Sequence, residues 1–92
     1  MGHRYQPVID LCNAALESVR ERIPAELYKE VHDDINRFNE CGVGLECLVD
    51  QLSELDIKIT PEQFTSIERA MQSMNLADDQ RMHYRRQHGV IA

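Results

Sequence analysis

The sequence predicts an all-α fold, a compact bundle of four main helices followed by a short fifth helix or a weakly ordered tail. Two observations lead to this prediction. Four segments repeat apolar residues at alternating spacings of three and four, which places each set on one face of an amphipathic helix. The residues between these segments are typical of helix starts and ends. The 92 residues are expected to form a single domain, 1–92, with its core over about 7–77 and the tail over 78–92.

The four apolar stripes follow one another along the chain. Segments of this length are marginal as isolated helices in water, so they must pack against one another to be stable. In chain order the stripes are Ile9, Cys12, Leu16, Val19 and Ile23; then Leu27, Val31, Ile35 and Phe38; then Leu45, Leu48, Leu52 and Leu55; and finally Phe64, Ile67, Met71 and Met74.

The starts of the first two helices, and the turn after the second, are marked by residues typical of those positions. Pro7 and Pro24 each fit the first position of a helix, where the missing N–H costs nothing. Asn39 is expected to end the second helix, and Gly42 and Gly44 are expected to belong to the turn that leads into the third.

The fourth helix is predicted to start within the stretch KITPEQF, residues 58–64. Thr60 fits the N-cap and Gln63 the third helical position, which together form a capping box. Ile59 before the cap and Phe64 after it form a hydrophobic staple. The preceding residues, 56–59, are expected to be an extended link whose isoleucine side chains pack into the core of the bundle. No second strand is recognisable to pair with it.

The chain after the fourth helix is less strongly patterned. Asn75 suits a left-handed cap at the end of that helix, with Leu76 folding back onto it. Asp78 and Asp79 fit the cap of a short fifth helix that ends at about Arg86, and the last four residues are expected to fray.

The sequence carries no recognisable catalytic or cofactor motif. It contains no phosphate-binding loop, no nucleophile elbow and no HExxH pattern, so we expect neither an enzyme nor a cofactor. The run His32-Asp33-Asp34 cannot converge on one metal ion, because successive helical residues diverge by about 100°. The three cysteines, Cys12, Cys41 and Cys47, have no CxxC spacing and are expected to be reduced thiols of a cytoplasmic protein. No apolar run is long enough to span a membrane.

Charge is distributed unevenly along the chain. The net charge is −6, but residues 1–80 carry −9 and residues 81–92 carry +3. The acidic body argues against nucleic acid as the direct ligand and favours a basic partner.

Two rows of carboxylates with a spacing of four residues account for much of this acidity, and we call them the acidic ridges. One is formed by Glu26, Glu30 and Asp34 in the second helix, and the other by Glu46, Asp50 and Glu54 in the third. Like charges at this spacing destabilise a helix slightly, so stability alone does not explain them. We predict that they dock on a basic protein surface, although a solvated face that maintains solubility would show the same pattern. The predicted contact residues are Glu26, Glu30, Asp33, Asp34, Glu46, Asp50, Glu54 and Asp56, with Tyr28 as an aromatic that could join them.

Residues 39–76, NECGVGLECLVDQLSELDIKITPEQFTSIERAMQSMNL, carry a recognisable pattern. A glycine-containing turn leads into LECLVDQLSELD, an I-x-I-T link follows, and PEQF opens a helix with IE close behind. In this respect the chain resembles the MafI-type immunity proteins of bacterial polymorphic toxin systems. Val43 departs from the pattern, since an aromatic often precedes the second glycine in that family. The first helix and the basic tail do not resemble the family.

The resemblance implies a protein that binds and neutralises a cognate toxin in the cytoplasm, as immunity proteins of contact-dependent growth inhibition systems do. Many such toxins are nucleases with basic grooves, which an acidic ridge would cover. The resemblance implies no particular binding residues, no cofactor and no oligomeric state.

Two other hypotheses remain open from the sequence. One is a helical adaptor that binds an amphipathic helix in a groove formed by Leu48, Leu52, Phe64 and Met71. The other is a nucleic-acid regulator that uses Arg81, Arg85 and Arg86.

Overall fold

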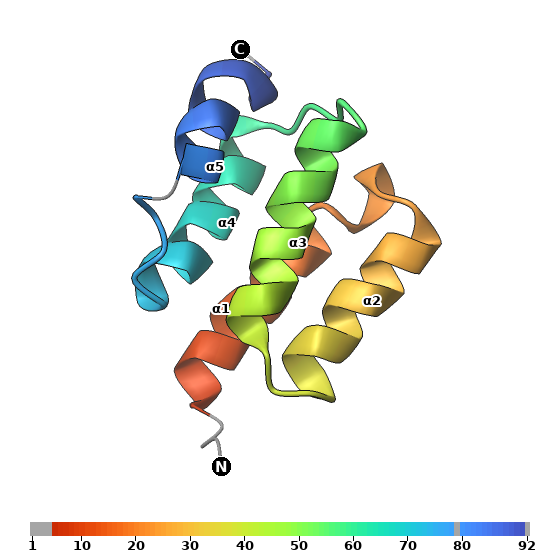
Figure 1. Ribbon diagram of the computed structural model, residues 1–92, viewed down its shortest axis with the longest axis vertical. Helices are drawn as coiled ribbons and strands as arrows, with labels where there is room; N and C mark the ends of the chain where they lie inside the picture. Colours follow the sequence, from red (N-terminus) through yellow and green to blue (C-terminus); the bar gives the residue numbers. More distant parts are fainter. Residues whose placement is uncertain (1–4, 79, 92) are drawn as a thin grey trace.

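The four main helices run alternately up and down the molecule (Figure 1), in a computed structural model that describes residues 5–78 and 80–91. This confirms the predicted all-α class with four main helices and a short C-terminal one. Two short non-α turns, η1 and η2, interrupt the order. The elements are α1 (Gln6–Ser18), η1 (Arg20–Arg22, a 3₁₀ turn), α2 (Ala25–Asn36), α3 (Cys41–Glu54), α4 (Pro61–Ser73), α5 (Gln80–Tyr84) and η2 (Arg85–Gly89, a π-helical turn).

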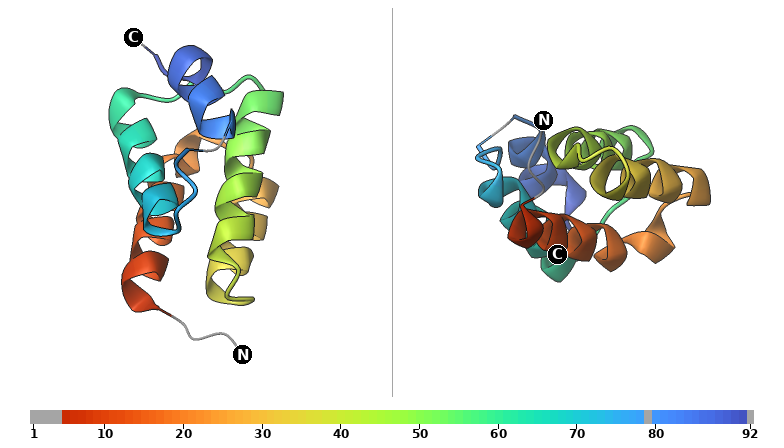
Figure 2. Two further views of the ribbon diagram at one scale, coloured as in Figure 1. Left: turned by 60° about the vertical axis from the view of Figure 1, so that its left-hand side comes forward. Right: turned by 90° about the horizontal axis from the view of Figure 1, so that it is seen from below.

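The helices pack mainly as two pairs. α1 lies along α4, and α2 lies along α3. The C-terminal segment, α5 with η2, lies between the upper parts of α3 and α4 (Figure 2). It contacts α3 through both elements, and Arg86 of η2 reaches Glu68 of α4. The segment therefore closes the gap between the two pairs.

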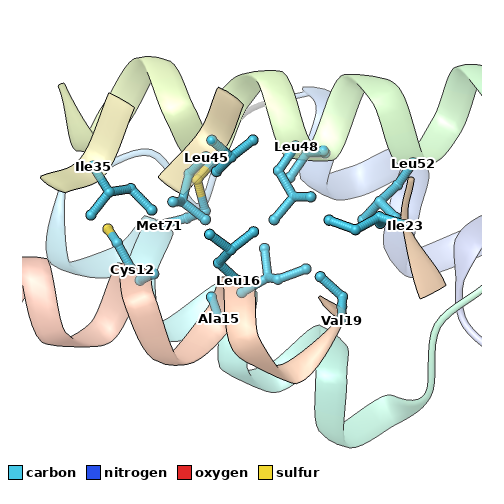
Figure 3. Packing of buried hydrophobic residues seen from close by; sticks show 14 of the residues in the cluster. Cys12, Ala15, Leu16, Val19, Ile23, Ile35, Leu45, Leu48, Leu52 and Met71 are labelled. Atoms are coloured by element: carbon cyan, nitrogen blue, oxygen red, sulfur yellow. The ribbon is translucent and has the colours of Figure 1, made fainter. Parts of the chain in front are cut away.

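One continuous cluster of apolar side chains from the five α-helices and the segments beside them forms the core, and Figure 3 shows its centre. Most of each predicted stripe lies in it. Phe38 and Leu55 were wrongly assigned to the core: their exposed fractions are 55% and 48%. The reason is that α2 ends at Asn36 and α3 ends at Glu54, so both residues lie beyond the helix whose face they were expected to continue. Met74 is half-buried at the rim of the core.

The first helix is shorter than its stripe suggests. It begins at Gln6, which places Pro7 in the second position, and it ends at Ser18. Val19 and Ile23 therefore flank η1 rather than extend α1, yet both are buried. Pro24 is the N-cap residue of α2 and not its first helical residue, with an extended ψ of 148°.

The turn between α2 and α3 also differs from the prediction. Asn39 does adopt the left-handed conformation, with φ of 56°. Gly42 and Gly44, however, belong to the first turns of α3, which begins at Cys41. Gly44 is needed there for close packing. A Cβ atom at this position would lie 3.0 Å from the Asp34 Cβ and 3.4 Å from the Val31 carbonyl oxygen of α2.

The α3–α4 junction confirms the predicted capping box. Thr60 Oγ1 accepts a hydrogen bond from the Gln63 amide at 3.1 Å, and Gln63 Oε1 accepts one from the Thr60 amide at 2.8 Å. Gln63 also donates from Nε2 to the Ser18 carbonyl at 2.8 Å, which ties α4 to the end of α1. Ile59 and Phe64, the predicted staple residues, both lie in the core.

The link before α4 has a partner that the sequence did not reveal. Ile59 forms an isolated parallel bridge with Val90, in which the Ile59 amide donates to the Gly89 carbonyl at 2.9 Å. The Ile91 amide in turn donates to the Ile59 carbonyl at 2.7 Å. Asp56 starts the link in the left-handed region, with φ of 54°, so the link is extended only in part.

The C-terminal segment packs against the bundle. Gly89 is buried, and Met82 is fully buried, so the core extends past the expected limit at residue 77. α5 begins at Gln80. The predicted cap included Asp79, which lies outside the described residues.

The end of α4 is a confirmed prediction. Asn75 is left-handed, with φ of 63°. The Leu76 amide donates to the Met71 carbonyl at 2.8 Å and the Asn75 amide to the Gln72 carbonyl at 3.0 Å, which is the Schellman pattern.

Candidate partner-binding surface

α2 and α3 pack side by side and antiparallel (Figure 1), so the two predicted acidic ridges lie on neighbouring helices. The close approach at Gly44 sets the two helices together. Both ridges affect Cys47 of α3: burial, followed by the charges of Glu30, Asp34 and Asp50, raises the pKa of its thiol. Carboxylates from both helices therefore act on the same point. We name the surface formed by the eight predicted contact residues the acidic face.

Half of the acidic face has intramolecular partners. Arg81 of α5 lies 2.8 Å from Asp50 and 3.6 Å from Glu46, measured between nitrogen and oxygen. Asp33 pairs with Lys29 at 3.0 Å, and Asp56 pairs with Lys58 at 3.2 Å. Because these pairs are at least partly exposed to solvent, each contributes little to folding stability.

The other half of the acidic face carries uncompensated charge. Glu26, Glu30, Asp34 and Glu54 make no ion pair with any described residue. Glu26, Glu30 and Glu54 are exposed, and Asp34 is half-buried. The strongest uncompensated field therefore lies along α2 and at the end of α3, on the side away from Arg81.

Two exposed apolar residues adjoin this face and were missed by the sequence analysis. Phe38 follows α2 and Val43 lies in the first turn of α3, with exposed fractions of 55% and 53%. The Arg37 guanidinium stands 5.5 Å above the Phe38 ring. Exposed aromatic and apolar side chains with a polar surround are typical of binding hot spots. A sequence signal was present: Phe38 immediately precedes the turn residue Asn39 and is spaced from Ile35 as the last apolar position.

Tyr28 has an internal role. Its hydroxyl donates a hydrogen bond to the Glu17 carboxylate of α1, and its ring stacks on His32 at 5.7 Å between centroids. The Arg20 guanidinium covers the ring at 4.5 Å. This cluster connects α1 with α2, and Tyr28 is half-buried in it.

The three arginines of the C-terminal segment contact the protein itself. Arg81 lies on the acidic face, as described above. Arg85 is buried and donates from Nη2 to the carbonyls of Ile57 at 2.6 Å and Gly89 at 3.1 Å. Arg86 pairs with Glu68 and lies over the Phe64 ring at 5.5 Å. These contacts account for the basic tail without a nucleic-acid ligand.

The groove expected of an adaptor is not formed by the residues predicted to line it. Leu48, Leu52, Phe64 and Met71 are all buried in the core. A depression of about 730 Å³ lies elsewhere, near η1, lined by Glu17, Ser18, Arg20, Glu21, Arg22 and Gln63. Several of its polar groups are already engaged: Gln63 binds Ser18, and Arg22 donates to the Lys58 carbonyl at 3.1 Å. We interpret it as part of the joint between α1 and α4.

The part of the chain that the structure describes, residues 5–78 and 80–91, contains neither a candidate metal cluster nor a candidate membrane-spanning helix. No group of three or more His, Cys, Asp or Glu side chains there could hold a metal ion. No helix of that part of the chain has the length and apolar character needed to cross a membrane. No protein-family model, curated protein or solved structure matches the chain.

Proposed function

We propose that this chain is an immunity protein, which binds a cognate toxin domain stoichiometrically and blocks it. The observation that carries the proposal is the acidic face of α2 and α3, which has uncompensated carboxylates along α2 and at the end of α3 and has Phe38 and Val43 exposed at the α2–α3 turn. This combination suits a partner that offers a basic surface with an apolar pocket or patch. The resemblance of residues 39–76 to the MafI-type family supports the same function.

The proposed partner is the C-terminal domain of a toxin from a contact-dependent growth inhibition or related system, a nuclease by preference. A nuclease must hold phosphates in a basic groove. A surface that carries Glu30, Asp34 and Glu54 would compete for that groove and exclude RNA or DNA from it. The protein would act without catalysis, in the cytoplasm, where such a toxin meets its substrate.

Charge reversal tests the acidic face directly. The double variant Glu30→Lys/Glu54→Lys changes two exposed residues that have no described ion pair, so the fold should be retained. The double variant Glu21→Lys/Glu62→Lys makes the same change in net charge at two residues of η1 and α4 that do not belong to the acidic face. The toxin domain to use is the variable C-terminal domain of a large secreted protein encoded next to this chain.

Each variant is co-expressed with that domain, and survival and co-purification are measured. We expect the Glu21/Glu62 variant to protect as the wild type does. The Glu30/Glu54 variant should lose protection and associate at least tenfold more slowly at low salt. Equal protection by both variants would show that the acidic face is the wrong surface. Failure of the wild-type protein to bind any neighbouring toxin domain would remove the proposed function.

A further inference from the structure

Arg81 of α5 lies in a fork formed by two carboxylates of the acidic face. Its Nε atom donates to Asp50 Oδ1 at 2.8 Å, and its Nη1 atom is 3.6 Å from Glu46 Oε2. The two acids are four residues apart, so they are neighbours on one side of α3. The protein therefore shows, with a side chain of its own, how this face holds a guanidinium group.

The C-terminal segment is anchored by contacts other than this fork. Met82, the next residue, is fully buried in the core. Farther along, Arg85 is buried as well, and Val90 forms the backbone bridge with Ile59. The Arg81 side chain is instead partly exposed to solvent. Its charged end can therefore leave α3 while the backbone of the segment stays in place.

We propose that Arg81 is a displaceable internal ligand of the acidic face, and that an arginine of the bound partner takes its place between Glu46 and Asp50. The inference rests on the proposed function, which supplies the partner, and it names the side chain that this partner presents. In the free protein the fork lowers the charge of the α3 ridge. Arg81 is thus an autoinhibitory group that a partner has to outcompete.

The geometry of the fork favours arginine over lysine in the partner. A guanidinium group is planar and offers several N–H groups, and two different nitrogens of Arg81 face the two carboxylates. An ammonium group is a compact point charge on a flexible stem and does not match this arrangement. A partner side chain that reproduces the Arg81 contacts therefore carries a guanidinium group.

Displacement of Arg81 has a small cost because the fork is open to water. The side chains of Arg81, Glu46 and Asp50 are 34%, 33% and 51% exposed. Ion pairs of this kind favour the paired state by a factor of only about 2 to 5. An internal competitor lowers the apparent affinity by the fraction of molecules in which the site is open. Removal of Arg81 should therefore strengthen binding by a factor of similar size.

An open carboxylate next to the fork provides a first contact for the partner. Glu54 is four residues beyond Asp50 on α3, is exposed, and makes no ion pair with any described residue. A basic surface attracted to Glu54 reaches the Arg81 fork one helical turn further along. The exchange of arginines therefore follows the first encounter.

The test uses the purified full chain and a hexa-arginine peptide, so it does not require an identified toxin. Arg81→Gln removes a positive charge from the acidic face. Arg86→Gln is the matched control, because it removes the same charge from the same segment but releases Glu68 of α4, which is outside the acidic face. Arg81→Lys retains the charge. Calorimetry measures the affinity, NMR of the side-chain carboxyl groups locates the peptide, and circular dichroism checks the fold.

We expect Arg81→Gln to bind the peptide about threefold more tightly than the wild type at low salt, with less gain at high salt. The carboxyl resonances of Glu46 and Asp50 should move when the peptide is added. Arg86→Gln should bind as the wild type does, and Arg81→Lys should stay closer to the wild type than to Arg81→Gln. A hexa-lysine peptide should bind Arg81→Gln less tightly than hexa-arginine does.

Several outcomes would overturn the proposal. Equal gains for Arg81→Gln and Arg86→Gln would reduce the effect to net charge, and an equal gain for Arg81→Lys would reduce it to lost packing. Weaker binding by Arg81→Gln would show that Arg81 positions the carboxylates instead of covering them. Unfolding of Arg81→Gln would show that the fork anchors the segment. Equal affinity for the two peptides would remove the preference for arginine.

The same variants, titrated with the neighbouring toxin domain, separate this inference from the proposed function. Arg81→Gln should associate about threefold faster than the wild type and Arg86→Gln at the wild-type rate. Equal rates for all three proteins would overturn the exchange of arginines and leave the proposed function standing. If no toxin domain binds the wild type, the proposed function falls, and the peptide titration alone decides whether Arg81 is displaceable.

Discussion

The two ends of the helix bundle are built differently. At the upper end in Figure 1, α1 ends, α2 begins, α3 ends and α4 begins, and the C-terminal segment lies there too. Side-chain hydrogen bonds join separate elements at this end: Gln63 to Ser18, Arg22 to Lys58, Lys58 to His88, and Arg85 to Ile57. At the lower end, the described cross-helix hydrogen bonds of this kind are those of the Asn13–Asn36 amide pair.

The turns at the two ends show the same contrast. The α3–α4 junction has a capping box and the fully buried Ile59. The α2–α3 turn has no side-chain cap on either side, and its flanking residues Phe38 and Val43 are exposed. Exposed apolar residues also occur at the upper end, where Leu55 and Ile91 are 48% and 41% exposed. The two ends therefore differ in hydrogen bonding. Several side-chain hydrogen bonds hold the helices in place at the upper end, whereas the lower end has fewer such bonds and exposes apolar residues beside the acidic face.

The largest expected effect is a difference in folding stability between substitutions at the two ends. Ile59→Ala removes a fully buried side chain at the upper end and should lower the free energy of unfolding by about 3 kcal/mol. Phe38→Ala, at the lower end, should change it by less than about 0.5 kcal/mol while it weakens binding of the toxin domain. Urea denaturation monitored by circular dichroism measures the first effect, and titration with the toxin domain measures the second. Similar losses of stability for both variants would contradict the comparison.

An intermediate effect is expected from a comparison of two glycines at the lower end. A Cβ at Gly44 would press on α2 at 3.0 Å, so Gly44→Ala should destabilise the fold by about 1–2 kcal/mol. At Gly42 the nearest atom, Leu76 Cδ1, is 3.7 Å away, which is an ordinary contact. Gly42→Ala should therefore gain about 0.5–1 kcal/mol from helix propensity. The difference in urea midpoint between the two variants is the measurement, and equal midpoints would show that α2 and α3 separate without cost.

The smallest effect concerns pH at the upper end. The hydrogen bond from Tyr28 is the main cause that lowers the pKa of Glu17 below its ordinary 4.5, and the same bond raises the pKa of Tyr28 above 10.0. The Glu17 contribution to stability is therefore present above pH 4.5 and is lost as pH falls through the lower folded-state pKa. The Tyr28 contribution is present below pH 10.0 and is lost as pH rises through its raised pKa.

Tyr28→Phe is the variant that tests this coupling, because it removes the hydroxyl and retains the ring. Its urea midpoint should depend less on pH than that of the wild type, both below pH 4.5 and above pH 10.0. Since the Glu17 side chain is 51% exposed to solvent, the difference should be small. Identical pH profiles for the two proteins would show that the Glu17–Tyr28 bond does not persist in solution.

Local signals predicted the helices and several of their ends. Apolar spacing identified the four main helices, and the residues Thr60, Gln63 and Asn75 identified a capping box and a Schellman cap that the structure confirms. These features depend on residues within one or two helical turns of each other. The eight residues proposed for partner contact were likewise read from spacing alone, and their role in binding stays a prediction.

Contacts between distant segments were not predictable in the same way. Nothing near Ile59 indicates that its backbone pairs with Val90, or that Arg81 lies on Glu46 and Asp50. The periodic pattern also continued into Phe38 and Leu55, where the helices had already ended. A stripe reports which face of a helix is apolar, but it does not report the residue at which the backbone leaves the helix.

The sequence by itself determined the fold class, the helical faces and the acidity of α2 and α3, because each is a property of neighbouring residues on one helix. Only the tertiary structure decided which carboxylates keep an uncompensated charge and which apolar residues remain in solvent. Those outcomes depend on where the C-terminal segment packs and on how closely α3 approaches α2 at Gly44. Both are set by packing between segments far apart in the chain.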